Sequence, residues 1–181
     1  MQQPRNVLIV GAGMAGMTLG LALGRRGTSC QIVEIRPALS EPGTGITLQG
    51  PALRALRTVG VLDDCVSRGF PQSFFKTCDA AGNVTGTVDL PNLLGQPYPC
   101  TIGIMRHEVH GVLAEQLEKS GVPIRLGTSI ASLSQDASGV DVEFTDGRKD
   151  RFDLVVGADG SNSTIRDRLF GTEMRPYYTG Q

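Results

Sequence analysis

The chain has 181 residues, of which 40% are hydrophobic and 19% are charged, and its formal net charge is −1. This composition is that of an ordinary globular protein and excludes an intrinsically disordered chain. A nucleic-acid-binding or anionic-membrane surface needs a basic excess, which this chain lacks. The four cysteines lie far apart, without the spacing of a zinc site or a disulfide framework. We therefore expect reduced thiols, no metal site and a cytoplasmic protein.

The first 36 residues predict a βαβ unit. Asn6–Val10 is a short aliphatic run, typical of a strand buried on both faces of a parallel sheet. A helix is expected over Met14–Arg25, and a second buried strand over Ser29–Ile35. The uncharged stretch Val7–Gly24 could also be a signal sequence or a membrane span. Its five glycines and the arginines that follow it favour strand, turn and helix instead.

The remaining elements predict a sheet completed late in the chain. The middle of the chain predicts a strand at Ile46–Leu48, helices at Pro51–Val59 and Val61–Ser67, a hairpin of Ser73–Cys78 with Val84–Asp89, a strand at Thr101–Met105 and a helix at Glu108–Glu118. A strand at Ile124–Leu126 could then rejoin the parallel sheet. After it we expect an antiparallel meander of Ser129–Leu133, Val140–Phe144 and Arg148–Phe152, a buried strand at Leu154–Gly157 and a helix at Ser163–Phe170. Ser161 or Ser163 is expected to cap that last helix, and His107 and His110 are expected at the surface. The fold class is α/β: a Rossmann-like, three-layer domain with a central parallel sheet and an antiparallel β-meander crossover.

Three glycines follow the first strand in the spacing Gly11-x-Gly13-x-x-Gly16 and lead into the first helix. In this context a glycine-rich turn holds the pyrophosphate of a dinucleotide. Gly11 permits the tight turn, Gly13 lets the backbone approach the pyrophosphate, and Gly16 lets the helix pack close to the strand. No capping side chain precedes Met14 and Ala15, so the N–H groups there can receive a phosphate. A glycine-rich turn without a ligand is the alternative.

Glu34 lies 18 residues after Gly16, at the C-terminal end of the second predicted strand. A carboxylate at this place accepts hydrogen bonds from the hydroxyls of a ribose. It would repel a 2′-phosphate, so the site favours FAD or NAD over NADP. The alternative is a solvated charge at a strand end.

Four segments stand in order along the chain: Val7–Gly16, Glu34-Ile35-Arg36, Gly43-Thr44-Gly45-Ile46-Thr47-Leu48 and Gly157-Ala158-Asp159-Gly160-Ser161-Asn162-Ser163. With them the chain resembles the N-terminal portion of the single-component FAD-dependent monooxygenases, the p-hydroxybenzoate hydroxylase-like flavoproteins. The glycine turn alone is common to many Rossmann proteins, whereas the last segment, with Arg166 after it, is more specific. The resemblance extends from Val7 to about Tyr178.

The resemblance implies roles in FAD binding for residues at the adenosine and at the phosphates. Glu34 would bind the adenosine ribose, with Arg36 nearby. Arg106 resembles the arginine that reaches FAD between the pyrophosphate and the flavin, where a guanidinium can pair with phosphate oxygens. Its alternative is a surface cation at a helix start.

Three further residues complete the implied site. Ile130 resembles the position whose backbone meets the adenine. Asp159 and Gly160 resemble the motif that supports both FAD and the passing NAD(P)H. An Asp-Gly turn that only ends a strand is the alternative for this pair, and the two roles are compatible.

The implied reaction is hydroxylation of a small aromatic substrate by O2, with NADPH or NADH as electron donor. No catalytic side chain is assigned, because the flavin carries the chemistry. A flavin-dependent dehydrogenase or reductase and a catalytically silent FAD-binding fragment are the alternatives. Family members carry a second Gly-Asp motif and a substrate domain that these 181 residues lack. We therefore expect residues 1–181 to be an N-terminal FAD-binding portion that a C-terminal segment complements.

Overall fold

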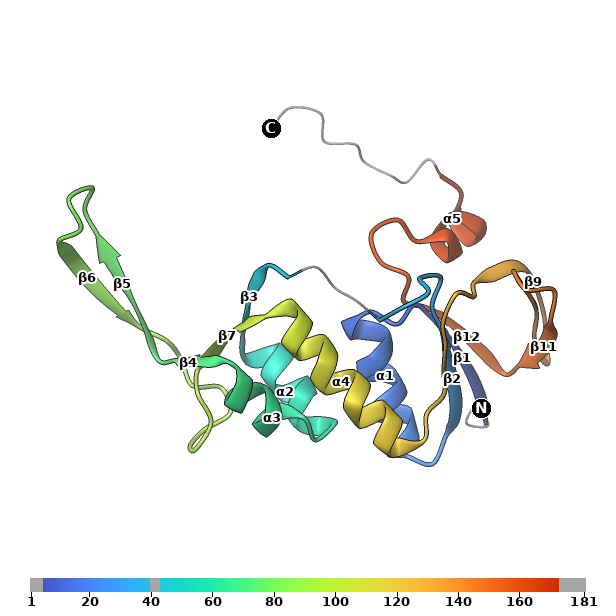
Figure 1. The fold of residues 1–181 in the computed structure, drawn as a ribbon, viewed down its shortest axis with the longest axis horizontal. Helices are drawn as coiled ribbons and strands as arrows, with labels where there is room; N and C mark the ends of the chain where they lie inside the picture. Colours follow the sequence, from blue (N-terminus) through green and yellow to red (C-terminus); the bar gives the residue numbers. More distant parts are fainter. Residues whose placement is uncertain (1–4, 40–42, 173–181) are drawn as a thin grey trace. The chain divides into compact units, whose positions relative to one another are not determined.

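The computed structural model describes residues 5–39 and 43–172 (Figure 1). The chain divides into two compact units, one of Met1–Leu39 with Gly121–Gln181 and the other of Ser40–Ser120. The first unit contains the glycine-rich turn, Glu34 and Asp159, whereas the second contains Arg106.

A four-stranded parallel sheet forms the centre of the first unit, in the order β12-β1-β2-β8. Its strands are β1 (Asn6–Val10), β2 (Ser29–Val33), β8 (Ile124–Arg125) and β12 (Leu154–Gly157). The parallel sheet and the return of the chain to it near Ile124 are confirmed. The second strand ends at Val33 and not at the predicted Ile35. The reason is local: the Glu34 carboxylate accepts the N–H of Arg36 at 3.0 Å and bends the backbone into a turn.

Opposite faces of this sheet are covered by a helix and by a meander (Figure 1). The side chain of Ile9 lies against Gly16 of α1 (Met14–Gly24). Because side chains alternate along a strand, Leu8 and Val10 point the other way. There they share a buried cluster with Phe144 and Phe152 of the meander. The meander consists of β9 (Ile130–Asp136), β10 (Gly139–Phe144) and β11 (Lys149–Phe152), all antiparallel. The predicted three-layer α/β fold is therefore confirmed.

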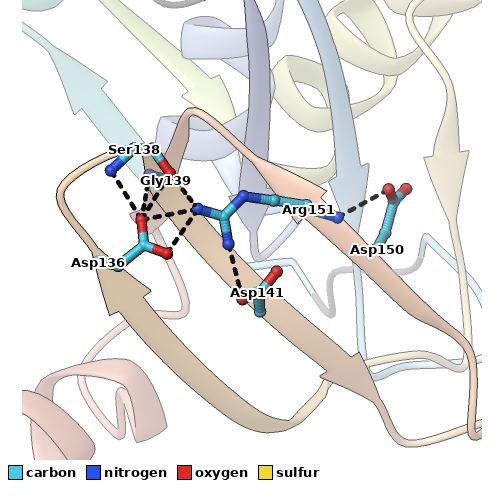
Figure 2. A network of polar contacts seen from close by, with 6 residues as sticks. All are labelled: Asp136, Ser138, Gly139, Asp141, Asp150 and Arg151. Carbon is cyan, nitrogen blue, oxygen red and sulfur yellow. Dashed lines mark hydrogen bonds and ion pairs between the residues drawn. The ribbon is translucent and has the colours of Figure 1, made fainter.

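One arginine ties the meander together at its exposed end (Figure 2). The guanidinium of Arg151 on β11 donates to both carboxylate oxygens of Asp136 at 2.7 and 2.8 Å, and to Asp141 at 2.6 Å. It also donates to the hydroxyl of Ser138 at 2.6 Å. The hydrogen bonds from Arg151 and Ser138 hold the pKa of Asp136 well below its usual range. A single side chain thus connects all three strands of the meander.

Replacing Arg151 with methionine should lower the thermal unfolding midpoint modestly at pH 7, because Asp136 and Asp141 lose their shared partner. A folded-state pKa below the unfolded value, about 3.9, means that the stabilisation exists above that pH and disappears as pH falls further. The difference from wild type should therefore shrink below about pH 4, and also in high salt. Lys149→Met on the same strand is the control, since within the described residues Lys149 makes one ion pair, at 3.7 Å to Glu143. Equal midpoints for the two variants would contradict the role of Arg151.

The second unit is built around a three-stranded antiparallel sheet, β3-β7-β4, and a separate β5–β6 hairpin. Its elements are β3 (Gly45–Leu48), α2 (Gly50–Thr58), α3 (Leu62–Arg68), β4 (Phe70–Gln72), β5 (Phe74–Cys78), β6 (Val84–Asp89), β7 (Thr101–Met105) and α4 (Arg106–Ser120). The predicted hairpin is confirmed, and its turn contains Gly82 with φ of +87°. The strand β4 was not predicted, because a three-residue segment with a central proline has no strand pattern.

The expected surface position of His110 is wrong, since only 5% of the residue is exposed. On a helix, His110 shares a stripe with Leu113 and Leu117, which are both fully buried. His107 is half-exposed, as expected.

All four cysteines are free, and Cys30, Cys65 and Cys100 are buried. Burial raises the pKa of the Cys65 thiol to about 11, so that thiol stays protonated at neutral pH. The described helices include none that is both long and apolar enough to cross a membrane.

Candidate functional site

The glycine-rich turn lies at the carboxyl end of β1, and its first glycine is needed by the fold. Gly11 has φ of +107°, a conformation that side chains with a Cβ rarely adopt. Its N–H donates to the carbonyl of Val33 at 2.8 Å. A Cβ on Gly11 would collide with the backbone of Ala158, which follows β12. Conformation and close approach therefore both exclude other residues at this position.

The third glycine is also needed by the fold, for a different reason. Gly16 lies in the first turn of α1, and a Cβ there would collide with the carbonyl oxygen of Gly11. It would also lie 3.3 Å from Cγ2 of Ile9. The absence of a side chain lets α1 pack directly on β1 and its turn.

The second glycine is not explained by the fold. Gly13 has φ of −73° and ψ of 176°, an extended conformation open to any residue. Among the described residues, no atom outside its own helix and chain neighbours lies within 4 Å of a Cβ built there. Gly13 is the N-cap of α1 and no side chain caps the helix. The space beside Gly13 is thus open, and unpaired N–H groups of a helix start attract a phosphate.

Glu34 follows β2 directly and lies beside this turn. Its Oε2 accepts the N–H of Ala12 at 2.8 Å, and its Oε1 accepts the N–H of Arg36 at 3.0 Å. The Glu34 backbone is anchored as well: its N–H donates to Arg125, and its carbonyl accepts the N–H of Thr128. The structure therefore brings Glu34 and the glycine turn together, as the 18-residue spacing predicted.

The same hydrogen bonds bring the segment before Ile130 close to Glu34. Gly127 donates its N–H to the carbonyl of Arg36 at 2.9 Å. Ile130 belongs to the buried core, with 3% of the residue exposed, so its side chain packs within the protein. Its carbonyl accepts a long hydrogen bond from Arg168, at 3.4 Å. The contact of Ile130 with adenine remains a prediction.

Asp159 follows β12 and caps the helix α5 (Thr164–Phe170). Its Oδ2 accepts the N–H groups of Thr164 and Ile165 at 2.7 and 3.1 Å, and its Oδ1 accepts the hydroxyl of Ser163. Ser163 is the N-cap, so of the two expected caps Ser163 is right and Ser161 is wrong. Burial disfavours the charge of Asp159, but these hydrogen bonds outweigh it and hold its pKa below the ordinary value. The architectural role of Asp159 is thus evident, next to Gly160 with φ of +82°.

Replacing Asp159 with asparagine should destabilise the protein at pH 7 by about 1 kcal/mol, the usual contribution of a helix cap. The amide keeps one acceptor, whereas the carboxylate satisfies several donors. Since the folded-state pKa is lowered, the stabilisation is present above the unfolded pKa and is lost as pH falls through the folded one. Chemical denaturation of both proteins at pH 7 and at pH 3 measures this difference in the free energy of unfolding. Ser161→Ala, at the position that does not cap α5, should have no effect; a loss equal to that of Asp159→Asn would contradict this assignment.

Arg106 belongs to the second unit, where it is the first residue of α4. Its N–H donates to the carbonyl of Thr44 at 3.1 Å, just beyond the ladder between β3 and β7. The glycine-containing segment that opens β3 therefore holds the start of α4. The contact of Arg106 with a cofactor remains a prediction.

A model of the FAD binding domain family matches residues 5–176. The chain belongs to this family. The match includes both ends of the proposed site, from the glycine turn to the helix that Asp159 caps. The family match thus identifies FAD as the cofactor class of this domain, and the part played by each residue remains a prediction.

Relatives of this FAD-binding domain include flavin monooxygenases. It is 33% identical over 165 residues to 3-amino-4-hydroxybenzoate 2-monooxygenase of Streptomyces cremeus, with 88% of this chain and 41% of the relative covered. It is 28% identical over 182 residues to 6-hydroxynicotinate 3-monooxygenase of Pseudomonas fluorescens, with 99% and 46% covered. The crystal structure of the flavin-dependent monooxygenase PieE, in complex with FAD and substrate, is similar with a TM-score of 0.75 at 26% identity, covering 91% of this chain and 31% of PieE. The chain thus spans less than half the length of these relatives.

Two contacts at the glycine-rich turn were not predicted from the sequence. Ala158 limits the space beside Gly11, and Ala12 donates its N–H to Glu34. Ala158 lies within the Gly157–Ser163 segment, but nothing in that pattern indicates which residue meets the glycine turn. The N–H of Ala12 carries no sequence signal at all, because every residue except proline has one.

Proposed function

We propose that this chain is the FAD-binding part of a flavoprotein monooxygenase that uses NADPH or NADH and O2 to hydroxylate a small aromatic substrate. The observation that carries the proposal is Gly13. The fold leaves a glycine there with no steric or conformational reason, at an uncapped helix start. A cofactor pyrophosphate supplies the missing reason.

The proposed FAD-binding residues follow the cofactor from adenosine to flavin. They are Glu34, Arg36 and Ile130 for the adenosine; Gly11, Gly13, Met14, Ala15 and Gly16 for the pyrophosphate; Arg106 between the pyrophosphate and the flavin; and Asp159 and Gly160 for FAD and the passing NAD(P)H. The chemistry of this set suits FAD: an acceptor carboxylate for the ribose, backbone donors for the pyrophosphate and a guanidinium for phosphate oxygens.

When bound, the flavin would supply hydride acceptance and oxygen transfer, and the protein would supply binding, orientation and exclusion of water. No side chain is assigned a catalytic role. An aromatic substrate is supported by the names of two relatives, which specify a hydroxybenzoate and a hydroxynicotinate. The electron donor rests on the resemblance of the Asp159–Gly160 segment.

The relatives are about twice as long as this chain. We therefore propose that a C-terminal segment complements these 181 residues in the active enzyme, which we place in the cytoplasm. A flavin-dependent dehydrogenase or reductase would bind FAD equally, and the reaction product distinguishes it from a monooxygenase.

The proposal is tested by adding FAD to the purified protein and measuring the flavin-to-protein ratio and the dissociation constant. The complete polypeptide, with any C-terminal continuation, is then supplied with NADPH or NADH and a panel of hydroxylated aromatic acids. Incorporation of one oxygen atom from 18O2 into the product, measured by mass spectrometry, is the expected result. Failure to bind FAD would refute the cofactor, whereas FAD binding and NAD(P)H oxidation without oxygen incorporation would favour a reductase.

A further inference from the structure

The carboxylate of Glu34 is held by backbone atoms on two sides. Its Oε2 accepts the N–H of Ala12 at 2.8 Å, 22 residues earlier in the chain, and its Oε1 accepts the N–H of Arg36 at 3.0 Å. Ala12 is the middle residue of the turn between β1 and α1. Glu34 thus contacts the pyrophosphate turn itself, and not only the place expected for a ribose.

The turn is fixed from its other sides by backbone contacts. The N–H of Gly11 donates to the carbonyl of Val33, and the N–H of Ala158 donates to the carbonyl of Val10, both at 2.8 Å. The two N–H groups that enter the turn, those of Gly11 and Ala12, therefore point at β2 and at the residue after it. Of these two N–H groups, the one of Gly11 donates to a backbone carbonyl, and the one of Ala12 donates to a side chain.

We propose that Glu34 is a positioning residue for the glycine turn, in addition to its contact with the ribose. By accepting the N–H of Ala12, it fixes the direction of the peptide before Gly13, and with it the helix start that receives the pyrophosphate. This inference rests on the proposed function for the identity of the ligand, but the contact between Glu34 and the turn does not.

A carboxylate can perform both roles at once. Its two oxygens offer about four acceptor sites, of which two are occupied by Ala12 and Arg36. The remaining sites can accept the hydroxyls of a ribose. A hydrogen bond to a charged acceptor stabilises more than one between neutral groups, so losing the carboxylate should loosen the turn even when no ligand is bound.

A thermodynamic cycle with two probes separates the two roles. ADP carries the ribose hydroxyls and 2′,3′-dideoxy-ADP does not, whereas both carry the pyrophosphate. If Glu34 only bound the ribose, Glu34→Ala would weaken ADP and leave dideoxy-ADP unchanged. We expect Glu34→Ala to weaken dideoxy-ADP as well, by about tenfold, and to weaken ADP by more. Isothermal titration of wild type and variant with both probes provides the four dissociation constants.

Two variants complete the cycle. Glu34→Gln keeps one acceptor oxygen, so it should restore much of the affinity for dideoxy-ADP. Glu143→Ala, which removes a glutamate that contacts Ser132 and Lys149 on the meander, should leave both affinities unchanged. Circular dichroism and thermal unfolding show whether each variant is folded.

A measurement without ligand tests the contact directly. Amide hydrogen exchange followed by NMR should be about tenfold faster or more for Ala12 in Glu34→Ala. The N–H of Gly11, which donates to a backbone carbonyl, serves as the internal control and should keep its rate. In Glu34→Gln, the N–H of Ala12 should exchange at an intermediate rate, faster than in wild type and slower than in Glu34→Ala.

The outcomes are distinct. Unchanged binding of dideoxy-ADP in Glu34→Ala, with unchanged exchange of Ala12, would overturn the inference and leave Glu34 as a ribose ligand alone. Tighter binding of dideoxy-ADP would also overturn it, since Glu34 would then compete with the phosphate for the N–H of Ala12. If wild type bound neither FAD nor ADP, the proposed function would fail, while the exchange of Ala12 would still decide whether Glu34 holds the turn.

Discussion

The Gly13→Val protein should fold normally and fail to retain FAD. Valine adopts the extended backbone of Gly13 without strain, and its side chain would extend into open space. That space is the one we assign to the pyrophosphate, so cofactor and side chain exclude each other. The dissociation constant for FAD should rise at least about 100-fold, equivalent to about 2.8 kcal/mol.

Flavin absorbance after gel filtration measures the amount of FAD retained by Gly13→Val, and fluorescence titration provides the dissociation constant. Gly13→Ala should show a smaller loss, because its methyl group fills less of the space. Gly111→Ala in α4 is the control, since its Cβ would lie 3.8 Å from Arg68, an ordinary contact. A yellow Gly13→Val protein with one flavin per chain would show that the pyrophosphate lies elsewhere.

Gly16→Ala should have the opposite phenotype, a loss of stability rather than a selective loss of cofactor. Its methyl group would collide with the carbonyl of Gly11 and press on Ile9, which is fully buried in the sheet. Neither neighbour can move freely, because one is backbone and the other is enclosed by the core. The expected destabilisation is about 3 kcal/mol or more, at the upper end of overpacking effects.

Urea unfolding of the cofactor-free proteins tests this difference, with Gly13→Ala as the matched variant three residues away. Gly13→Ala should unfold close to wild type, and Gly16→Ala at a clearly lower urea concentration, with the same m-value. Coincident unfolding curves for the two variants would mean that α1 can shift away from β1, against the packing described.

Local patterns were sufficient for most elements of the parallel sheet. The aliphatic run of Asn6–Val10, the glycine spacing and the helix from Met14 lie within a few residues of one another, so their sequence encodes their geometry. The position of Glu34 was predicted for the same reason, because one helix and one strand of standard length separate it from Gly16. The meander was also predictable, since its β segments follow one another at short intervals and Asp146-Gly147 marks the turn between the last two.

Other features depended on contacts that the pattern of residue types did not specify. His110 is buried because α4 packs that face against its unit, although the apolar pattern did not include a histidine. Ser163 rather than Ser161 caps α5, because Asp159 binds both the Ser163 hydroxyl and the first N–H groups of the helix.

The glycine turn shows most clearly what the sequence determines and what the tertiary structure decides. Its existence and its place between β1 and α1 follow from sequence alone, because a tight turn between a strand and a helix requires glycine locally. Which glycines the fold requires was decided only by tertiary structure. Ala158, 147 positions later, blocks any side chain at Gly11, while no described residue approaches the open side of Gly13. Steric exclusion acts between atoms that are close in space, and a pattern of residue types along the chain does not specify which distant backbone will come within contact distance.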